Sequence, residues 1–178
     1  MLLFLPAVVL AGPAGRWQCI SGIVIDTARR AEIVASVQHY NQAPPDPHQL
    51  DAEWPTLVST DEPLRKVLRN PAAKLMQHVI QSVSQQGEAF LMGANGGLVA
   101  STDKSTDFWQ GDEDQFTQAI GLASGQVHVD DQVSDESTYS IQARLSTPVY
   151  DPATQKAIGV LMLGSDAFVL DYLRTCDK

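Results

Sequence analysis

The chain has 178 residues, a formal net charge of −9 and 44% hydrophobic residues. This composition is typical of a globular domain with a buried core, and the length suits a single domain. The negative charge disfavours nucleic acid as a partner, since phosphate groups require a basic face.

Residues 1–15 begin the chain with an apolar segment that ends in small residues. We predict a signal peptide over 1–15, with 16–178 as one mature domain. The segment is shorter than the ~20 apolar residues of a membrane span, and no later stretch reaches that length. A periplasmic or secreted location is expected, with no membrane span in the mature chain.

The two cysteines, Cys19 and Cys176, lie near opposite ends of the chain. In an exported protein such a pair is a candidate disulfide, which would bring the two ends together. The alternative is two unpaired thiols at frayed ends.

The first half of the chain has helical periodicity. Residues 20–42 predict one long helix, with an apolar face at i, i+3 and i+4 spacing that includes Ile20, Val24, Ala31 and Ala35. Pro44, Pro45 and Pro47 end it. Shorter helices are predicted within 48–58, after Pro63 and over 72–86.

The second half changes to strand periodicity. A hairpin is predicted around the turn 94–97, and a polar loop over 101–111 leads into a short helix over 112–120. Strands follow at 126–129, 138–150 and 157–163, with a terminal helix at 166–174. In the second of these strands Ala143 and Leu145 alternate with Arg144 and Ser146. The order predicts an α+β fold, with helices packed on an antiparallel sheet of about five strands.

The usual sequence motifs of enzymes are absent: the chain has no phosphate-binding loop, GxSxG, HExxH or CxxC. We therefore expect no catalysis and no cofactor. A hydrolase that uses Asp103 or Asp107 with His128 is a weaker interpretation that no residue spacing supports.

Binding residues are expected in the polar loop and on the neighbouring strands. Phe108 is predicted to be a core aromatic, while Trp109 suits either the core or the wall of a small-molecule pocket. Arg144 projects from the polar face of its strand, where it can hold a carboxylate through two hydrogen bonds. Its alternative is a surface ion pair with an acid such as Asp135.

Two acidic groups leave a second function open. One spans 103–114 and the other 130–136, and hard divalent cations prefer such oxygen ligands. The spacing matches no calcium loop, so solvated acids are the simpler interpretation. The alternative function is a module that binds a divalent cation or a partner through an acidic surface.

Three segments resemble single Cache (PDC-type, PAS-like) extracytoplasmic sensor domains. The string VASTDKSTDFWQGDE at 99–113 resembles the family's VAxSDxTSDYWQGDE, with Phe108 in place of the usual Tyr. The string DESTY at 135–139, followed by Gln142 and TPV at 147–149, resembles a second family motif. DPAT at 151–154 with IGVL at 158–161 resembles the closing hairpin. The resemblance covers about residues 20–174.

The resemblance implies a PAS-like fold, in which a long N-terminal helix and short helices pack on a five- to six-stranded antiparallel sheet. It also implies a pocket between the sheet and the polar loop for a small carboxylate or amino acid. Carried over by position, the ligand-binding candidates are Asp103, Ser105, Asp107, Trp109, Gln110, Tyr139, Gln142 and Asp166, to which the strand pattern adds Arg144.

In this family occupancy is passed to a membrane-bound sensor kinase or chemoreceptor. We expect no membrane helix or signalling domain after Lys178, so this chain is expected to be similar to stand-alone exported members, and signalling would need a separate partner. The family's fold brings both ends of the chain together, which fits a Cys19–Cys176 bridge.

Overall fold

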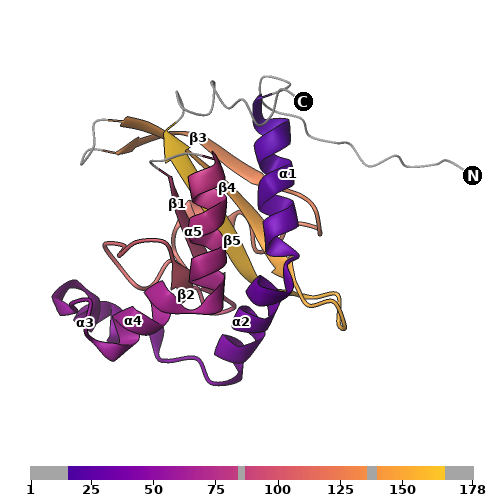
Figure 1. The fold of residues 1–178 in the computed structure, drawn as a ribbon. Coiled ribbons are helices and arrows are strands. Elements are labelled where there is room, and N and C mark those ends of the chain that lie inside the picture. The colour runs from indigo at the N-terminus through magenta and orange to yellow at the C-terminus, as the bar shows by residue number, and fades with distance from the viewer. Residues whose placement is uncertain (1–15, 84–86, 136–139, 167–178) are drawn as a thin grey trace, which may run out of the picture.

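The structure is a computed structural model that describes residues 16–83, 87–135 and 140–166 (Figure 1). The predicted signal peptide, Tyr139, Cys176 and nearly all of the predicted terminal helix lie outside these residues. Within them, helices pack on a five-stranded antiparallel sheet. The predicted α+β fold, with helices packed on an antiparallel sheet of five strands, is confirmed.

The N-terminal part is two helices, α1 (Arg16–Ala28) and α2 (Ala31–Gln42), where the sequence predicted one. Arg30 interrupts the helix because its backbone is extended, with φ −64° and ψ 140°, and it begins α2 as the N-cap. The break rotates the apolar face. Ile33, Val34 and Val37 are therefore buried in α2, whereas Ala31 and Ala35, which the uninterrupted pattern had placed inward, are exposed.

Prolines mark where the following helices begin. They are α3 (Pro47–Glu53), the 3-10 turn η1 (Trp54–Thr56), α4 (Glu62–Arg69) and α5 (Pro71–Val83). The missing amide hydrogen of a proline costs nothing in the first turn of a helix. Asp46 caps α3 by accepting hydrogen bonds from the backbone N–H groups of His48 and Gln49.

The sheet has the order β2-β1-β5-β4-β3, and all of its neighbouring strands are antiparallel. Its strands are β1 (Glu88–Gly93), β2 (Leu98–Ser101), β3 (His128–Asp135), β4 (Ser140–Tyr150) and β5 (Ala157–Asp166). The predicted strand at 126–129 begins two residues later and runs on to Asp135. The predicted helix at 112–120 is the single turn α6 (Asp114–Thr117), and Asp166 ends a strand rather than beginning a helix.

Strand alternation builds one apolar core on each face of the sheet. Ala89 and Leu91 of β1 join the core beneath α1, α2 and α5, whereas Phe90 and Met92 join the core on the opposite face. In Figure 1, α1 and α5 lie across the first face, while α3 and α4 lie near β2. The second face is closed by α4, η1 and the loop that follows β2. That loop contains most of the predicted binding residues.

The β1–β2 turn depends on glycine at Gly96, where φ is +80°. This left-handed conformation is accessible to glycine without steric cost. A Cβ on Gly96 would also collide with the backbone of Gly111. The turn and the end of the polar loop are thus in direct contact.

Candidate functional site

The polar loop after β2 is fixed at its middle by α3 and η1. A side-chain oxygen of Asp51 accepts hydrogen bonds from the backbone N–H groups of Phe108 (2.7 Å) and Trp109 (2.9 Å). The indole of Trp54 donates to the carbonyl of Ser105 over 3.0 Å. Phe108 is fully buried against Trp54, so its predicted core position is confirmed. The loop is held as a defined shape over the second face of the sheet.

Trp109 lies on the outer side of this loop and is partly buried. Its indole N–H donates to the carbonyl of Asn95 in the β1–β2 turn over 2.9 Å. Its ring packs edge-on against His48, with 4.4 Å between the ring centroids. Trp109 therefore joins the loop to the hairpin and to α3, and its binding role stays a prediction.

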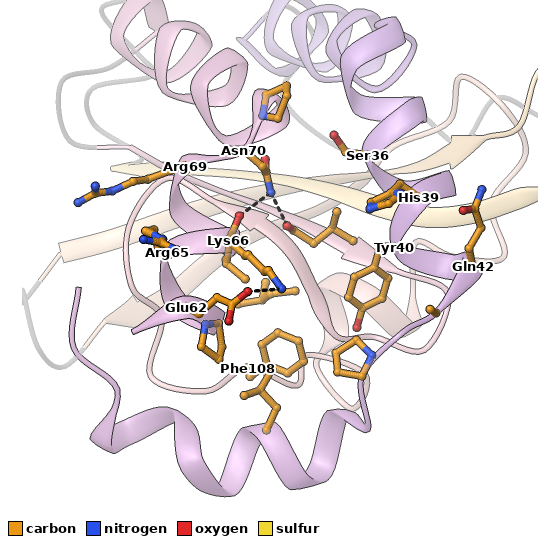
Figure 2. A pocket seen from close by; sticks show the side chains of 18 of the residues that line it. Ser36, His39, Tyr40, Gln42, Glu62, Arg65, Lys66, Arg69, Asn70 and Phe108 are labelled. Atoms are coloured by element: carbon orange, nitrogen blue, oxygen red, sulfur yellow. Dashed lines mark hydrogen bonds and ion pairs between the residues drawn. The ribbon is translucent and has the colours of Figure 1, made fainter. Parts of the chain in front are cut away.

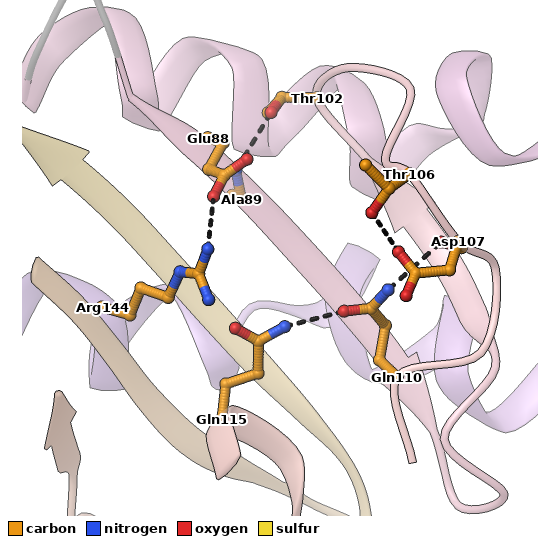
Figure 3. A network of polar contacts seen from close by, with 8 residues as sticks. All are labelled: Glu88, Ala89, Thr102, Thr106, Asp107, Gln110, Gln115 and Arg144. Carbon is orange, nitrogen blue, oxygen red and sulfur yellow. Dashed lines mark hydrogen bonds and ion pairs between the residues drawn. The ribbon is translucent and has the colours of Figure 1, made fainter. Parts of the chain in front are cut away.

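A chain of polar contacts runs from the loop toward α6 (Figure 3). Gln110 donates from Nε2 to the carbonyl of Asp107 over 3.1 Å, and its Oε1 accepts from Nε2 of Gln115 over 2.7 Å. Gln110 and Gln115 are both buried. Thr106 also donates to a carboxylate oxygen of Asp107. Two of the predicted binding residues, Asp107 and Gln110, are thus brought into one network.

Arg144 reaches the other end of this network from β4. It lies opposite Asp130 of β3 and Gly164 of β5 in the strand register. Its guanidinium lies 3.9 Å from a carboxylate oxygen of Glu88, and its side chain is 25% exposed. Figure 3 shows Arg144 and Gln115 side by side, both in front of the sheet. The predicted projection of Arg144 from the polar face of its strand is confirmed.

Arg144 and Gln115 both line a cavity of about 340 Å³. Its lining is made entirely of polar and charged residues, namely Asp112, Glu113, Asp114, Gln115, Asp130 and Arg144. The size lies at the lower end of the range for small-molecule sites, roughly 300–1,000 Å³. This cavity brings together Arg144, found from the strand pattern, and three acids of the 103–114 group.

Two buried polar atoms at this cavity have no hydrogen-bond partner among the described residues. One is the Nε donor of Arg144 and the other is the Oε1 acceptor of Gln115, a residue that is only 4% exposed. Buried polar groups in folded proteins are nearly always satisfied, because leaving one unpaired costs about 1–3 kcal/mol. One of these atoms is a donor and the other is an acceptor. A polar molecule bound in the cavity could form a hydrogen bond with each of them.

Electrostatics in the cavity favour positive charge. Burial raises the pKa of the Glu113 carboxyl, and the neighbouring carboxylates Asp107 and Asp112 raise it further, while Arg144 acts in the opposite direction. A nearby cation would favour the ionised form of the Glu113 carboxyl, because it would offset the burial and the negative charges that disfavour this form. Glu113 is therefore a candidate partner for a ligand's positive group.

The remaining predicted residues are not brought to this cavity by any described contact. Asp103 is exposed, and its carbonyl accepts a hydrogen bond from Ser101. Ser105 donates to the carbonyl of Asp107 over 2.6 Å. Gln142 and Asp166 are register partners in β4 and β5, two positions along the strands from the Arg144–Gly164 pair. Tyr139 lies outside the described residues, so the roles of these positions stay predictions.

Sequence reasoning missed Gln115 and Glu88. Gln115 directly follows an acidic stretch, and Phe116 and Ala119 beside it are buried. The inward face of that turn was the available signal. Glu88 begins β1 and meets Arg144 only because β5 lies between β1 and β4, and no local sequence pattern indicated that these two residues would meet.

A larger groove of about 1190 Å³ lies between α2, α3 and α4 (Figure 2). Some of its polar groups have partners. Lys66 forms an ion pair of 2.8 Å with Glu62, and the amide of Asn70 donates to the carbonyls of Lys66 and Val99. None of the orphaned polar atoms of the described residues belongs to this groove. Of the predicted loop residues only Phe108 reaches it, so the smaller cavity is the stronger candidate site.

The described residues also bear on metal binding and on membrane insertion. In the described part of the chain, no group of three or more His, Cys, Asp or Glu side chains has an arrangement that could hold a metal ion. Nor does any helix there combine the length and apolar character that crossing a membrane requires. The described residues also include no free cysteine, but Cys176 lies outside them, so the disulfide stays a prediction.

No protein-family model matches the sequence, and no curated protein matches it significantly. Among solved structures, the chain is similar to the ligand-binding domain of the Campylobacter jejuni chemoreceptor Tlp3 in complex with 4-methylisoleucine. The identity is 15%, the TM-score 0.47, and the match covers 89% of this chain and 63% of that one.

Two other sensor domains are similar to a comparable degree. The Vibrio cholerae histidine kinase DctB sensor domain has 17% identity and a TM-score of 0.45 over 88% of this chain and 59% of that one. The ligand-binding domain of the Pseudomonas fluorescens chemoreceptor CtaA in complex with L-serine has 10% identity and a TM-score of 0.47, over 84% and 51%. This chain thus spans about half to two thirds of these structures' lengths. Because these TM-scores are below 0.5, the ligands of these domains do not indicate which ligand this chain binds.

Proposed function

We propose that this chain is an extracytoplasmic, Cache-type sensor domain that binds a small molecule without turnover, and that its ligand carries both a carboxylate and an ammonium group, as a free amino acid does. The ligand would lie in the cavity between Arg144 and Gln115. Support for the family comes from the three motifs together with the PAS-like strand order.

The proposed ligand class rests on one observation, which is the pair of buried atoms at the cavity that have no hydrogen-bond partner. The unpaired Nε–H of Arg144 calls for an acceptor, and a carboxylate is the acceptor that a guanidinium binds best. The unpaired Oε1 of Gln115 calls for a donor, which an ammonium group supplies. A zwitterion satisfies both atoms at once, whereas a simple carboxylate satisfies only one.

Charge in the cavity agrees with this choice. Four of its six lining residues are acids and one is basic. A dicarboxylate would meet like charges on several sides, which is unfavourable where side chains are partly buried. The ammonium group of an amino acid would instead lie close to Glu113 or Asp130.

The sensor role implies a partner outside this chain. We propose that the domain acts in the periplasm or after secretion and passes its occupancy to a membrane-bound kinase or chemoreceptor. The loop is suited to such coupling because Trp109 and Asp51 join it to the hairpin and to α3. A ligand that reorganises the loop would move these elements with it.

The test is a thermal-shift screen of the protein with amino acids, mono- and dicarboxylates, and calcium or magnesium. A ligand at 100 times its dissociation constant adds about 2.7 kcal/mol of stability, which gives a clear shift. We expect hits among amino acids. A response to divalent cations alone, reversed by a chelator, would instead support the cation-binding alternative, and no response to any organic ligand would contradict the proposal.

Variants then locate the site by calorimetry. Arg144→Ala and Gln115→Leu should each weaken binding of the hit by about tenfold or more, since each removes a charged or buried hydrogen bond. Arg29→Ala is the matched control, because Arg29 is exposed at the α1–α2 break. Trp109→Ala should weaken binding indirectly. Unchanged affinity in the Arg144 and Gln115 variants would move the site elsewhere.

A further inference from the structure

The cavity next to Arg144 has more negative charge than a zwitterion can compensate. Asp112, Glu113, Asp114 and Asp130 line it, against the single guanidinium of Arg144. Glu88, 3.9 Å from that guanidinium, already compensates part of the positive charge. An amino acid with a neutral side chain brings one charge of each sign, so it leaves the excess of carboxylates unchanged.

The residues that line the cavity also indicate which kind of side chain a bound amino acid would have. Each residue that borders the cavity is charged or polar. An aliphatic or aromatic ligand side chain would find no apolar surface there and would strip water from carboxylates without repaying the cost. A side chain that ends in a cation would gain from the same carboxylates.

The four acids differ in depth. Glu113 and Asp130 are partly buried, whereas Asp112 and Asp114 are exposed. The anchoring atoms, Nε of Arg144 and Oε1 of Gln115, are buried. A ligand held at its α-carboxylate and α-ammonium by these two residues would extend a long side chain outward, toward the exposed acids at the mouth.

We propose, on the basis of the function proposed above, that this site selects amino acids with a positively charged side chain. Arg144 and Gln115 bind the α-carboxylate and α-ammonium, and the acids around α6 bind the side-chain cation. Gln115 makes this more than an acidic patch, because its buried, unpartnered oxygen lies at the same cavity and calls for a donor. The ligand class is thus arginine, lysine or ornithine rather than an apolar or acidic amino acid.

The experiment is calorimetry of the full chain with four probes: L-arginine, L-lysine, L-valine and L-glutamate. We expect the two basic amino acids to bind at least about tenfold more tightly than valine, and glutamate to bind most weakly. Agmatine, which is arginine without its carboxylate, should bind more weakly than arginine because Arg144 loses its partner. Equal or tighter binding of valine would overturn this inference and leave the amino-acid site intact. Failure of all amino acids to bind would instead overturn the proposed function itself.

Charge variants provide the decisive control. Asp112→Asn with Asp114→Asn removes two exposed negative charges at nearly constant shape, so the preference for lysine over valine should fall by about threefold to tenfold, while valine affinity stays within about twofold. The matched control is Asp26→Asn, because Asp26 is exposed on α1, which covers the opposite face of the sheet. If the preference is the same in the double variant as in the parent, the acids do not select the side chain. High salt should reduce the preference in the parent protein.

Discussion

The phenol of Tyr40, near the end of α2, donates a hydrogen bond of 3.1 Å to the side-chain oxygen of Asn95 in the β1–β2 turn. Asn95 also accepts the indole N–H of Trp109 at its backbone carbonyl. One residue of the hairpin turn thus contacts both the second helix and the polar loop. A Cβ on Gly97, two residues after Asn95, would overlap the Tyr40 hydroxyl, so this close approach requires glycine at position 97.

We expect Tyr40 to titrate at unusually high pH. Burial raises the pKa of its phenol from 10.0 to about 12, and the hydrogen bond to Asn95 opposes this only in part. The pKa of the Tyr40 phenol is higher in the folded protein than in the unfolded chain. The contribution of this phenol to the free energy of unfolding is therefore complete below pH 10.0 and is lost as the pH rises through about 12. Stability measured from pH 9 to 12 in the parent and in Tyr40→Phe tests this. The two curves should converge at high pH, and parallel curves would contradict the prediction.

Asp51 should be one of the most important polar residues for stability. Its carboxylate accepts two backbone N–H groups of the polar loop, and hydrogen bonds to charged groups contribute about 1.5–3 kcal/mol each. Asp51→Ala should therefore lower the free energy of unfolding by about 2–4 kcal/mol, measured by urea denaturation. Asp51→Asn keeps an acceptor oxygen and should cost about half as much. The exposed Glu53→Gln change on the same helix serves as the control.

Gln155 is the one described residue other than glycine with positive φ, at 55°. It occupies the β4–β5 turn, where its backbone N–H donates to the carbonyl of Asp151. Left-handed backbone is unfavourable for a residue with a Cβ and free of that cost for glycine. Gln155→Gly should raise the free energy of unfolding by about 0.5–1 kcal/mol, partly offset by the greater freedom of the unfolded chain. Gln155→Val should lower it, and the reverse order would show that the turn is not strained.

The Cys19–Cys176 bridge stays a prediction with a direct test. The chain-entropy model assigns a closed loop of this length about 4–5 kcal/mol of stability, with strain reducing that amount. Alkylation of the oxidised protein followed by intact-mass measurement should find no reactive thiol before reduction and two after it. Reduction should lower the urea midpoint, and the Cys19→Ser and Cys176→Ser double variant should match the reduced protein. Two thiols that react without reductant would exclude the bridge.

The sequence was informative wherever a local pattern decides the structure. Alternation along 138–150 correctly placed Leu145 in the core and Arg144 on the opposite face, and the ANGG string correctly predicted the hairpin turn. The break at Arg30 had no such signal. Neither glycine nor proline lies there, although α1 and α2 each bury their own apolar residues in the same core. The apolar face assigned to Ala31 and Ala35 was wrong for that reason.

The candidate site was less predictable because its members come from distant parts of the chain. Gln110 and Gln115 are close in sequence, but Glu88 and Arg144 meet only through the strand order. The loop motif named Asp107 and Gln110 as ligand-binding candidates. The structure places both in one polar network, and their binding role stays a prediction. The motif could not show that Trp109 would point toward His48 and the hairpin, since the direction of a side chain in a loop depends on what packs over it.

The position of β5 governs how the chain can be assembled during synthesis. This last described strand lies between β1 and β4, so it joins a hairpin from residues 88–101 to another from residues 128–150. Until Ala157–Asp166 has left the ribosome, both hairpins have an open edge and neither core is complete. Strands with open edges pair readily with other chains. At about 5–20 residues per second the wait is only seconds long, but it ends only when nearly all of the domain has been made. Factors that shield these open edges would therefore protect the chain until β5 has been made.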